Sequence, residues 1–251
     1  MKAIMFFFLL GASFSSFAQH DKDKDKDKKD DWDKKERFMP VITRGIGASF
    51  QKFDGINNRV AGLPQYKQLK DYTATLSLGW LKEYNHFISG ADAMVGSSMS
   101  GDRDKRSSTI RYIGAGFYLG YNVLNSKTIM LYPLAGLGFQ KYQARFFKDN
   151  SAVDFNNVLV SPATQNNIRP VDFKNSFLTY RVGFGLAFKN PKYPSSSIGL
   201  QAAYTGGFKS RAWKSSDDQT LANAPEDNLS QFHVGLIFTM APWFMMKHGK
   251  M

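Results

Sequence analysis

The residues of this chain that could perform hydrolytic chemistry are its four histidines, since no cysteine is present to act as a thiol nucleophile or a disulfide partner. A histidine base needs a serine nucleophile beside it and a carboxylate to orient it. Two positions after His86 and His233 stand Ile88 and Gly235, so neither histidine has a serine next to it on the same strand face. No metal-ligand spacing, phosphate loop or dinucleotide fingerprint appears. We therefore expect no catalysis, no cofactor and no metal.

Six charged residues stand out because they interrupt uncharged, apolar segments. Asp92 and Arg181 fall near the middle of two such segments. They could gate a pore or relay protons, but we favour a buried structural pair, because an unpaired charge inside a protein is costly. The other four lie near segment ends, where they could bind phosphate groups or extend their charged ends from an apolar surface into water. These four are Lys52, Arg111, Lys141 and Arg145.

The segments that carry these residues alternate with a period of two, which is the pattern of β-strands. In "IRYIGAGFYLGYNVL" (110–124), the odd positions from Ile113 to Val123 are apolar, while the even ones are Gly, Tyr or Asn. The same alternation predicts eight strands, near Val41–Phe53, Tyr72–Lys82, Phe87–Met99, Thr109–Leu124, Ile129–Phe146, Ser176–Phe188, Ser197–Trp213 and Leu229–Met240.

The connections between these segments alternate in length. Short connections at 83–86, 125–127 and 189–196 are interleaved with mostly longer, polar ones at 54–71, 100–108, 147–175 and 214–228. Barrels of the bacterial outer membrane are organised in this way. We therefore expect an all-β fold: an eight-stranded antiparallel transmembrane β-barrel with an up-and-down meander, short periplasmic turns and longer extracellular loops.

The polar face of the segments decides which side chains face lipid. A water-facing exterior carries about a quarter to a third charged residues, whereas this face holds mostly Gly, Ser, Thr, Gln and Ala, with Arg181 a rare charge. Such a face suits a narrow lumen, so the apolar positions should face lipid. Aromatic residues towards the strand ends should form interfacial girdles. They are Tyr72, Trp80, Phe87, Tyr121, Tyr132, Phe188, Tyr204 and Phe208.

The amino terminus reads as a secretory signal, with Lys2, an apolar run from Ile4 to Leu10 and a small-residue exit that ends at Ala18. We expect a signal peptide at 1–18, a charged, disordered periplasmic tether at 19–37, an outer-membrane barrel at 38–240 and a periplasmic tail at 241–251.

The net charge of +12 does not mark a basic arm for nucleic acid, because residues 20–37 hold eight basic and eight acidic residues. A tract with so few apolar residues cannot offset the entropy of ordering it. A cation-binding aspartate cluster is the alternative, but each aspartate has a lysine neighbour that competes for it.

The strands "YIGAGFYLGYNV" and "YRVGFGLAF" and the last segment resemble the Gram-negative outer-membrane β-barrel domain family, particularly its PorT-like and OmpX-like eight-stranded group. Members of that group end in a signal read by the barrel-assembly machinery: polar, any, glycine, two of any, aromatic, any, hydrophobic. The stretch "HVGLIFTM" resembles this signal, with His233, Gly235, Phe238 and Met240 in the four places.

We expect a non-catalytic integral protein of the cell outer membrane with a structural or interaction role, in which a lipid-anchored barrel displays its loops. Its partners would be outer-membrane lipid and lipopolysaccharide, at the basic residues near the strand ends, and a protein at loop 148–173, since loops this long are usually functional or disordered. A lipid-modifying enzyme and a narrow small-solute pore are the alternatives, although a packed eight-stranded lumen should conduct very little.

Overall fold

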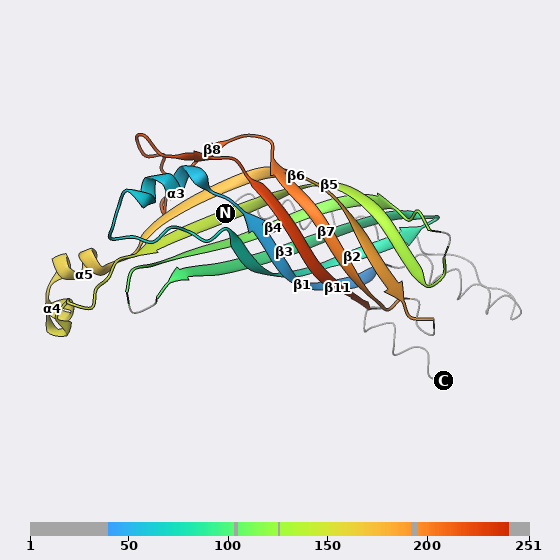
Figure 1. Cartoon of the computed structure of the whole chain (residues 1–251), viewed down its shortest axis with the longest axis horizontal. Coiled ribbons are helices and arrows are strands. Elements are labelled where there is room, and N and C mark those ends of the chain that lie inside the picture. The colour runs from blue at the N-terminus through green and yellow to red at the C-terminus, as the bar shows by residue number, and fades with distance from the viewer. Residues whose placement is uncertain (1–39, 103–104, 125, 192–194, 241–251) are drawn as a thin grey trace, which may run out of the picture. The chain divides into compact units, whose positions relative to one another are not determined.

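A computed structural model of the chain describes residues 40–102, 105–124, 126–191 and 195–240. The predicted signal peptide (1–18), tether (19–37) and tail (241–251) lie outside the described residues. The described chain forms eight long strands arranged around a barrel (Figure 1). They are β1 Val41–Gln51, β2 Tyr72–Tyr84, β3 Phe87–Gly101, β4 Ser107–Tyr121, β5 Ile129–Phe147, β6 Val171–Lys189, β7 Ser197–Gly207 and β11 Ser230–Met240.

Each long strand pairs antiparallel with its neighbours in chain order, and β11 pairs with β1 to close the ring. In the closing pair, Gly47 lies opposite Gly235 and Ser49 lies opposite His233. Closure gives every long strand a hydrogen-bonded partner on both sides, which removes the exposed edges of an open sheet. The predicted all-β meander barrel of eight antiparallel strands is therefore confirmed.

The two ends of the barrel differ in how the strands are joined. At the short-turn end, Asn85 and His86 connect β2 to β3 with φ of 47° and 69°, the conformation of a two-residue type I′ hairpin turn. The opposite end, which we call the long-loop end, carries the connections after β1, β5 and β7. The β3–β4 connection there covers only 102–106, because both strands run beyond their predicted ends at Met99 and Thr109.

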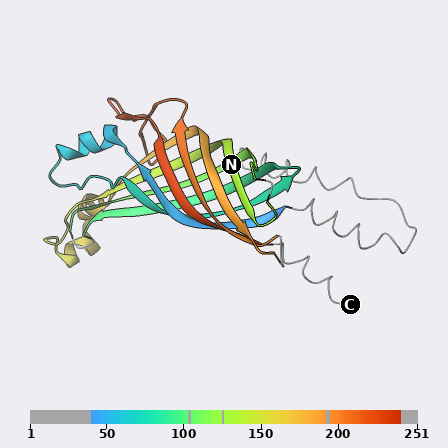
Figure 2. The same cartoon turned by 45° about the vertical axis from the view of Figure 1, so that its right-hand side comes forward.

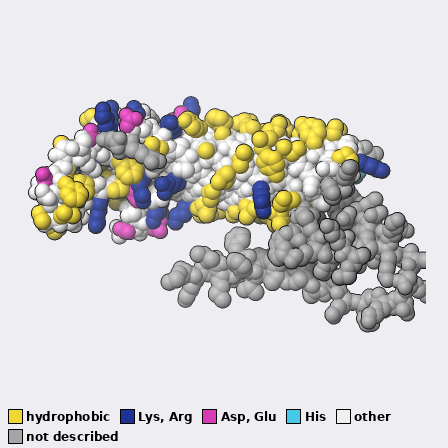
Figure 3. Space-filling view, turned by 90° about the horizontal axis from the view of Figure 1, so that it is seen from below, with side chains coloured by type: hydrophobic (Ala, Val, Ile, Leu, Met, Phe, Trp, Pro, Cys, Tyr) yellow, Lys and Arg dark blue, Asp and Glu magenta, His cyan; other side chains and the backbone are white. Residues whose placement is uncertain are grey.

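Alternation along the strands places the apolar positions outside. Phe117 (57% exposed), Leu119 (64%) and Val182 (48%) point away from the barrel, whereas Gly116 and Gly183 face inward. Large exposed apolar side chains recur on all eight strands, and Figure 3 shows them as a broad band, with Lys, Arg, Asp and Glu gathered mainly at one end. The exterior of the barrel is therefore apolar, and the inward positions hold glycines together with polar and buried apolar side chains.

The inward glycines make room for tyrosine rings rather than for an empty lumen. A Cβ atom at Gly96 would lie 2.1 Å from the ring of Tyr112, and one at Gly90 would lie 2.4 Å from the ring of Tyr118. Tyr132 also points inward and is buried, so its assignment to an interfacial girdle is wrong. Its even position in β5 puts it on the lumen face, although it lies near a strand end.

A cap of short elements lies over the long-loop end (Figure 1). It consists of the helix α3 (Asp54–Ala61) and the two-residue strands β8 (Arg211–Ala212), β9 (Lys214–Ser215) and β10 (Glu226–Asp227). The seventh strand was predicted to reach Trp213 but ends at Gly207. The reason is that Trp213 turns into the interior, where it is 1% exposed, instead of continuing the barrel wall.

The β5–β6 hairpin extends furthest from the barrel and ends in two short helices, α4 (Phe155–Val160) and α5 (Pro162–Ile168) (Figures 1 and 2). The β6 strand begins at Val171, five residues before the predicted Ser176, because it continues the pairing with β5 as far as Phe146 opposite Val171. In the part of the chain that the structure describes, no helix is long and apolar enough to cross a membrane.

Filling the space beside a lumen tyrosine should destabilise the barrel. We expect Gly90→Leu to lower the free energy of unfolding by at least about 1–3 kcal/mol, because the new side chain overlaps the Tyr118 ring. Urea unfolding of the protein in lipid vesicles, followed by tryptophan fluorescence, measures this change. The control Ala91→Leu adds the same side chain to the outer face, and equal effects of the two substitutions would contradict the assigned orientation.

Candidate functional site

The lumen is filled at both ends by buried apolar clusters. The turn-end cluster contains Leu81, Ile88, Tyr118, Met130, Tyr132, Leu134 and Ala187. The loop-end cluster joins the barrel wall to the cap and contains Phe53, Ile56, Val60, Leu69, Met94, Ile110, Tyr112, Tyr142, Ala144, Phe146, Phe177, Trp213 and Leu229.

Asp92 and Arg181 lie between the clusters and bind each other across the lumen. Arg181 Nη1 donates to Asp92 Oδ2 at 2.6 Å, and Nη2 donates to Oδ1 at 3.1 Å. Both side chains are only 11% exposed. A two-pronged pair of this kind compensates for the removal of both charges from water, and loss of either partner would leave the other charge buried and unpaired.

A second polar network joins β1, β4, β5 and β11. The Ser49 hydroxyl lies 3.0 Å from His233 Nδ1 and 3.1 Å from the Tyr112 hydroxyl. Nearby, three side chains close a ring of hydrogen bonds in which Tyr142 donates to Gln140 Oε1, Gln140 donates to Gln231 Oε1, and Gln231 donates to the Tyr142 hydroxyl. These bonds satisfy polar groups that have little access to solvent.

The contact of Ser49 with His233 was missed by the sequence analysis, which looked for serine on the same strand as the histidine. The signal lies in the pairing of the first strand with the last, because that register sets Ser49 directly opposite His233. The pair does not form an accessible nucleophile. Ser49 is fully buried, and the carboxylate of Asp92 is engaged by Arg181.

A second charged pair, which the sequence analysis did not indicate, lies at the short-turn end. Lys189 donates to Glu83 Oε2, and Asn122 Nδ2 donates to Glu83 Oε1 at 2.9 Å. Both Glu83 and Lys189 have inward parity near the ends of β2 and β6, which is the signal that could have suggested the pair.

The arrangement of the lumen leaves little room for a solute. The space beside Arg181, lined in part by Met94, Gln140 and Thr179, has a volume of about 10 Å³. A cavity of that size holds at most about one water molecule. Among the described residues, no cluster of three or more His, Cys, Asp and Glu side chains could hold a metal ion.

The four basic residues near strand ends do not form one continuous collar. Arg111 and Lys141 are exposed on the outer face of β4 and β5, and Lys52 is exposed just after β1, on the opposite side of the ring. Arg145 is engaged by Asp172, with Nε–Oδ1 and Nη2–Oδ2 distances of 2.8 Å. Asp172 therefore neutralises one of the four predicted cations.

The structure adds two cations to Arg111 and Lys141. Arg111 lies opposite Gln143, Gln143 opposite Lys174, and Lys174 opposite Lys214. This register places the side chains of Lys174 and Lys214 beside the same outer surface. Sequence analysis missed them because 171–175 was expected to be loop and because β9 was not predicted.

The four residues of the predicted assembly signal all lie on β11. His233 and Gly235 face the lumen, whereas Phe238 and Met240 are exposed on the outer face near the short-turn end. The outer positions therefore continue the apolar exterior.

Loop 148–173 presents an apolar knob, which we define as Phe155, Leu159 and Val160 of α4. Their side chains are 73%, 64% and 76% exposed. The Asp154 carboxylate caps α4 by accepting from the backbone N–H groups of Asn156 and Asn157. No charged residue occurs between 155 and 168. At the base of the loop, the hydroxyl and N–H of Ser151 donate to Asp149 and lower the pKa of its carboxyl group.

The cap is held together by one carboxylate. Asp227 accepts from the N–H of Gly55 at 2.7 Å, from the N–H of Ile56 at 3.1 Å and from the Trp213 indole N–H at 2.7 Å. It thus satisfies two N–H groups in the first turn of α3 and fixes the ring that fills the loop-end cluster. The Tyr66 ring packs beside that cluster, and its burial raises the pKa of its hydroxyl.

The closed meander, filled lumen and apolar exterior define the fold as that of the small outer-membrane β-barrels. No family model and no curated protein matches the chain. Among solved structures, it is similar to the attachment invasion locus protein Ail of Yersinia pestis (16% identity, 80% of this chain, 97% of Ail, TM-score 0.44). It is also similar to a major outer membrane protein from Thermus thermophilus (9%, 80% and 99%, TM-score 0.46) and to Neisserial surface protein A (10%, 79% and 95%, TM-score 0.42). Each of the three shares little sequence with this chain.

Breaking the lumen pair from either side should be costly. We expect Asp92→Asn and Arg181→Met each to reduce the free energy of unfolding by about 3–5 kcal/mol, because the remaining charge loses its partner in a buried site. The double variant Asp92→Asn/Arg181→Met should recover most of that loss. Urea titrations in vesicles of one composition test the cycle, and additive losses in the double variant would refute a mutually dependent pair.

Proposed function

We propose that this protein is a non-catalytic integral β-barrel of the cell outer membrane, with a structural and interaction role. The observation that carries the proposal is the apolar exterior: large side chains such as Phe117, Leu119 and Phe184 are about half exposed or more around a closed ring of strands. Exposing so much apolar surface to water is unfavourable, whereas lipid hydrocarbon accommodates it. A cleaved signal peptide at 1–18 would deliver the chain to the periplasm.

The interior supports a role without catalysis or conduction. The two apolar clusters occupy the lumen on either side of the Asp92–Arg181 pair, which argues against a solute pore. Burial of Ser49 argues against a lipid-modifying enzyme built on its contact with His233.

The glycine-aromatic strands and the motif on β11 favour the PorT-like and OmpX-like group. In this proposal, His233, Gly235, Phe238 and Met240 form the signal read by the barrel-assembly machinery. The apolar outer positions Phe238 and Met240 support that role because they lie exposed on the last strand.

The long-loop end is the part of the molecule suited to contact a partner. In the proposed orientation it faces outward from the cell, and the α4–α5 tip projects beyond the barrel (Figure 2). The apolar knob at Phe155, Leu159 and Val160 belongs to α4 of this tip. Exposed apolar patches of this kind mark interaction sites. The absence of charge in 155–168 fits a protein partner with an apolar contact surface.

The basic residues near the long-loop end fit contacts with lipopolysaccharide phosphates. Lys52, Arg111, Lys141 and Arg145 were predicted to form this rim, and Arg111 and Lys141 are the members of it that share one exposed face. Guanidinium and ammonium groups at the membrane edge can bind phosphate. The pairing of Arg145 with Asp172 reduces its availability for that contact.

Single cysteines test the proposed location and orientation, because the natural chain has none. Leu159→Cys should react with a membrane-impermeant maleimide on intact cells, since its position lies on the outward loop. His86→Cys, in the β2–β3 turn, should react only after the outer membrane is permeabilised. The reverse labelling pattern would overturn the orientation, and recovery of both variants in the soluble periplasm would overturn the membrane location.

Removing the two basic side chains on the shared face should weaken lipopolysaccharide binding. We expect Arg111→Gln/Lys141→Gln to bind purified lipopolysaccharide at least about tenfold less tightly, because each charge-assisted hydrogen bond contributes about 1.5–3 kcal/mol. Co-purification with lipopolysaccharide in detergent measures the change. Lys127→Gln, at the short-turn end, is the matched control. Unchanged retention by the double variant would contradict the rim.

A further inference from the structure

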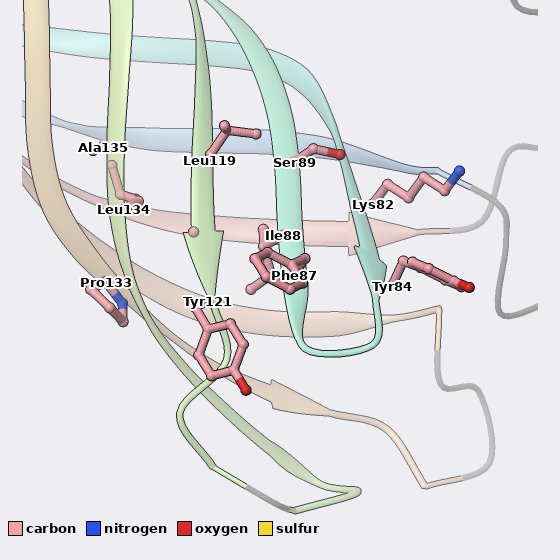
Figure 4. A pocket seen from close by; sticks show the side chains of 11 residues that line it. Lys82, Tyr84, Phe87, Ile88, Ser89, Leu119, Tyr121, Pro133, Leu134 and Ala135 are labelled. Carbon is pink, nitrogen blue, oxygen red and sulfur yellow. The ribbon is translucent and has the colours of Figure 1, made fainter.

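An open groove of about 850 Å³ runs across the outer face of β2, β3, β4 and β5 near the short-turn end (Figure 4). Its floor is low because Ser89 and Ala135, at outward positions of β3 and β5, have small side chains. The side chains of Leu119, Phe87 and Tyr121 rise around this floor. The groove therefore interrupts the otherwise bulky exterior with a recess that an apolar chain could enter.

The residues that line the groove form two rows across the strands, and one row lies nearer the short-turn end than the other. Register places Lys82, Ser89, Leu119 and Ala135 in one cross-strand row, because each lies opposite the next. The rings of Phe87 and Tyr121 form the next row towards the short turns, with centroids 5.3 Å apart in an edge-to-face contact. Figure 4 shows this second row nearer the β2–β3 turn. The recess thus lies next to a short row of aromatic side chains, on the side away from the short turns.

The lining combines an apolar surface with a single charge. Of the described residues that line the groove, Lys82 alone is charged, and it lies on the outer face of β2 at one edge of the recess. No ion pair of Lys82 with another described residue is present. A ligand that matches this lining must carry an apolar chain and, near one end, an anionic group.

We propose that the groove is a binding site for an anionic glycerophospholipid of the periplasmic leaflet, with an acyl chain on Ser89, Leu119 and Ala135 and the phosphate at Lys82. This assignment rests on the proposed function, since it requires the apolar exterior to lie in the outer membrane. The short-turn end faces the periplasm in that orientation. The phosphate then lies near the side chains of Phe87 and Tyr121, because lipid headgroups are found at the level of interfacial aromatic residues. Charge complementarity with Lys82 selects an anionic lipid over a zwitterionic one.

The test uses the full-length protein, inserted into vesicles that contain equal amounts of phosphatidylethanolamine and phosphatidylglycerol. After extraction in mild detergent, native mass spectrometry counts the lipids that remain bound. We expect the natural chain to retain one phosphatidylglycerol. Ala135→Phe fills the recess and should lower that retention at least about tenfold, whereas Ala115→Phe, on the same exterior but outside the groove, should leave it unchanged.

A second variant tests the headgroup contact. Lys82→Gln should abolish the preference for phosphatidylglycerol over phosphatidylethanolamine, while Lys127→Gln, an exposed lysine of the β4–β5 turn, should preserve it. Retention by Ala135→Phe equal to that of the natural chain would overturn the groove assignment. A dimer that Ala135→Phe dissociates would also overturn it, because a second copy would then be the occupant.

The folding state separates this assignment from the proposed function. A folded barrel shows a shift in electrophoretic migration between unheated and boiled samples. A protein that inserts into vesicles and shows the shift, but retains no phosphatidylglycerol, refutes the groove alone. A folded protein that stays in the aqueous phase refutes the membrane location on which the groove depends.

Discussion

The interior of an eight-stranded barrel is only a few side chains wide, and each inward group must fit beside those on the opposite wall. This barrel meets the constraint by placing glycines, which have no side chain, beside large tyrosine rings. Gly96 lies against Tyr112 and Gly90 against Tyr118, so that each ring occupies space its neighbour leaves free. The same narrowness brings Asp92 and Arg181 within hydrogen-bonding distance, although they come from distant parts of the chain.

Because the interior is filled, the features that could bind other molecules lie on the outer surface. Several polar groups in the lumen bind one another, as in the Ser49–His233 contact and the Glu83–Lys189 pair. The exposed features have different characters at different heights: an uncharged apolar knob beyond the barrel, cations at the loop-end rim and a recess near the short turns. We infer that the barrel wall holds these three features at different heights, so that each lies in a different environment.

Much of the fold could be predicted because alternation with a period of two is a local property of the sequence. It was sufficient for the eight strands and for the outward orientation of Phe117 and Val182. The contacts were harder to predict, since parity gives the face of a residue but not its height or its partner. Ser49 contacts His233 because the pairing of β1 with β11, which closes the barrel, sets the two residues opposite each other. Tyr132 was misplaced because its position near a strand end was given more weight than its parity.

The cap was unpredictable for a different reason. Trp213 follows β7 closely in the sequence, which suggested that the strand continues to it. Its ring instead turns away from the barrel wall, becomes buried and donates a hydrogen bond to Asp227. Since Asp227 also binds the first turn of α3, segments far apart in the sequence depend on one carboxylate. An insertion into 54–61 would disturb the anchorage of 211–227, and an insertion into 211–227 would disturb that of 54–61. The α4–α5 hairpin tip, in contrast, makes no contact with Asp227. The sequence of that tip can therefore adapt to a partner without disturbing the anchorage of the cap.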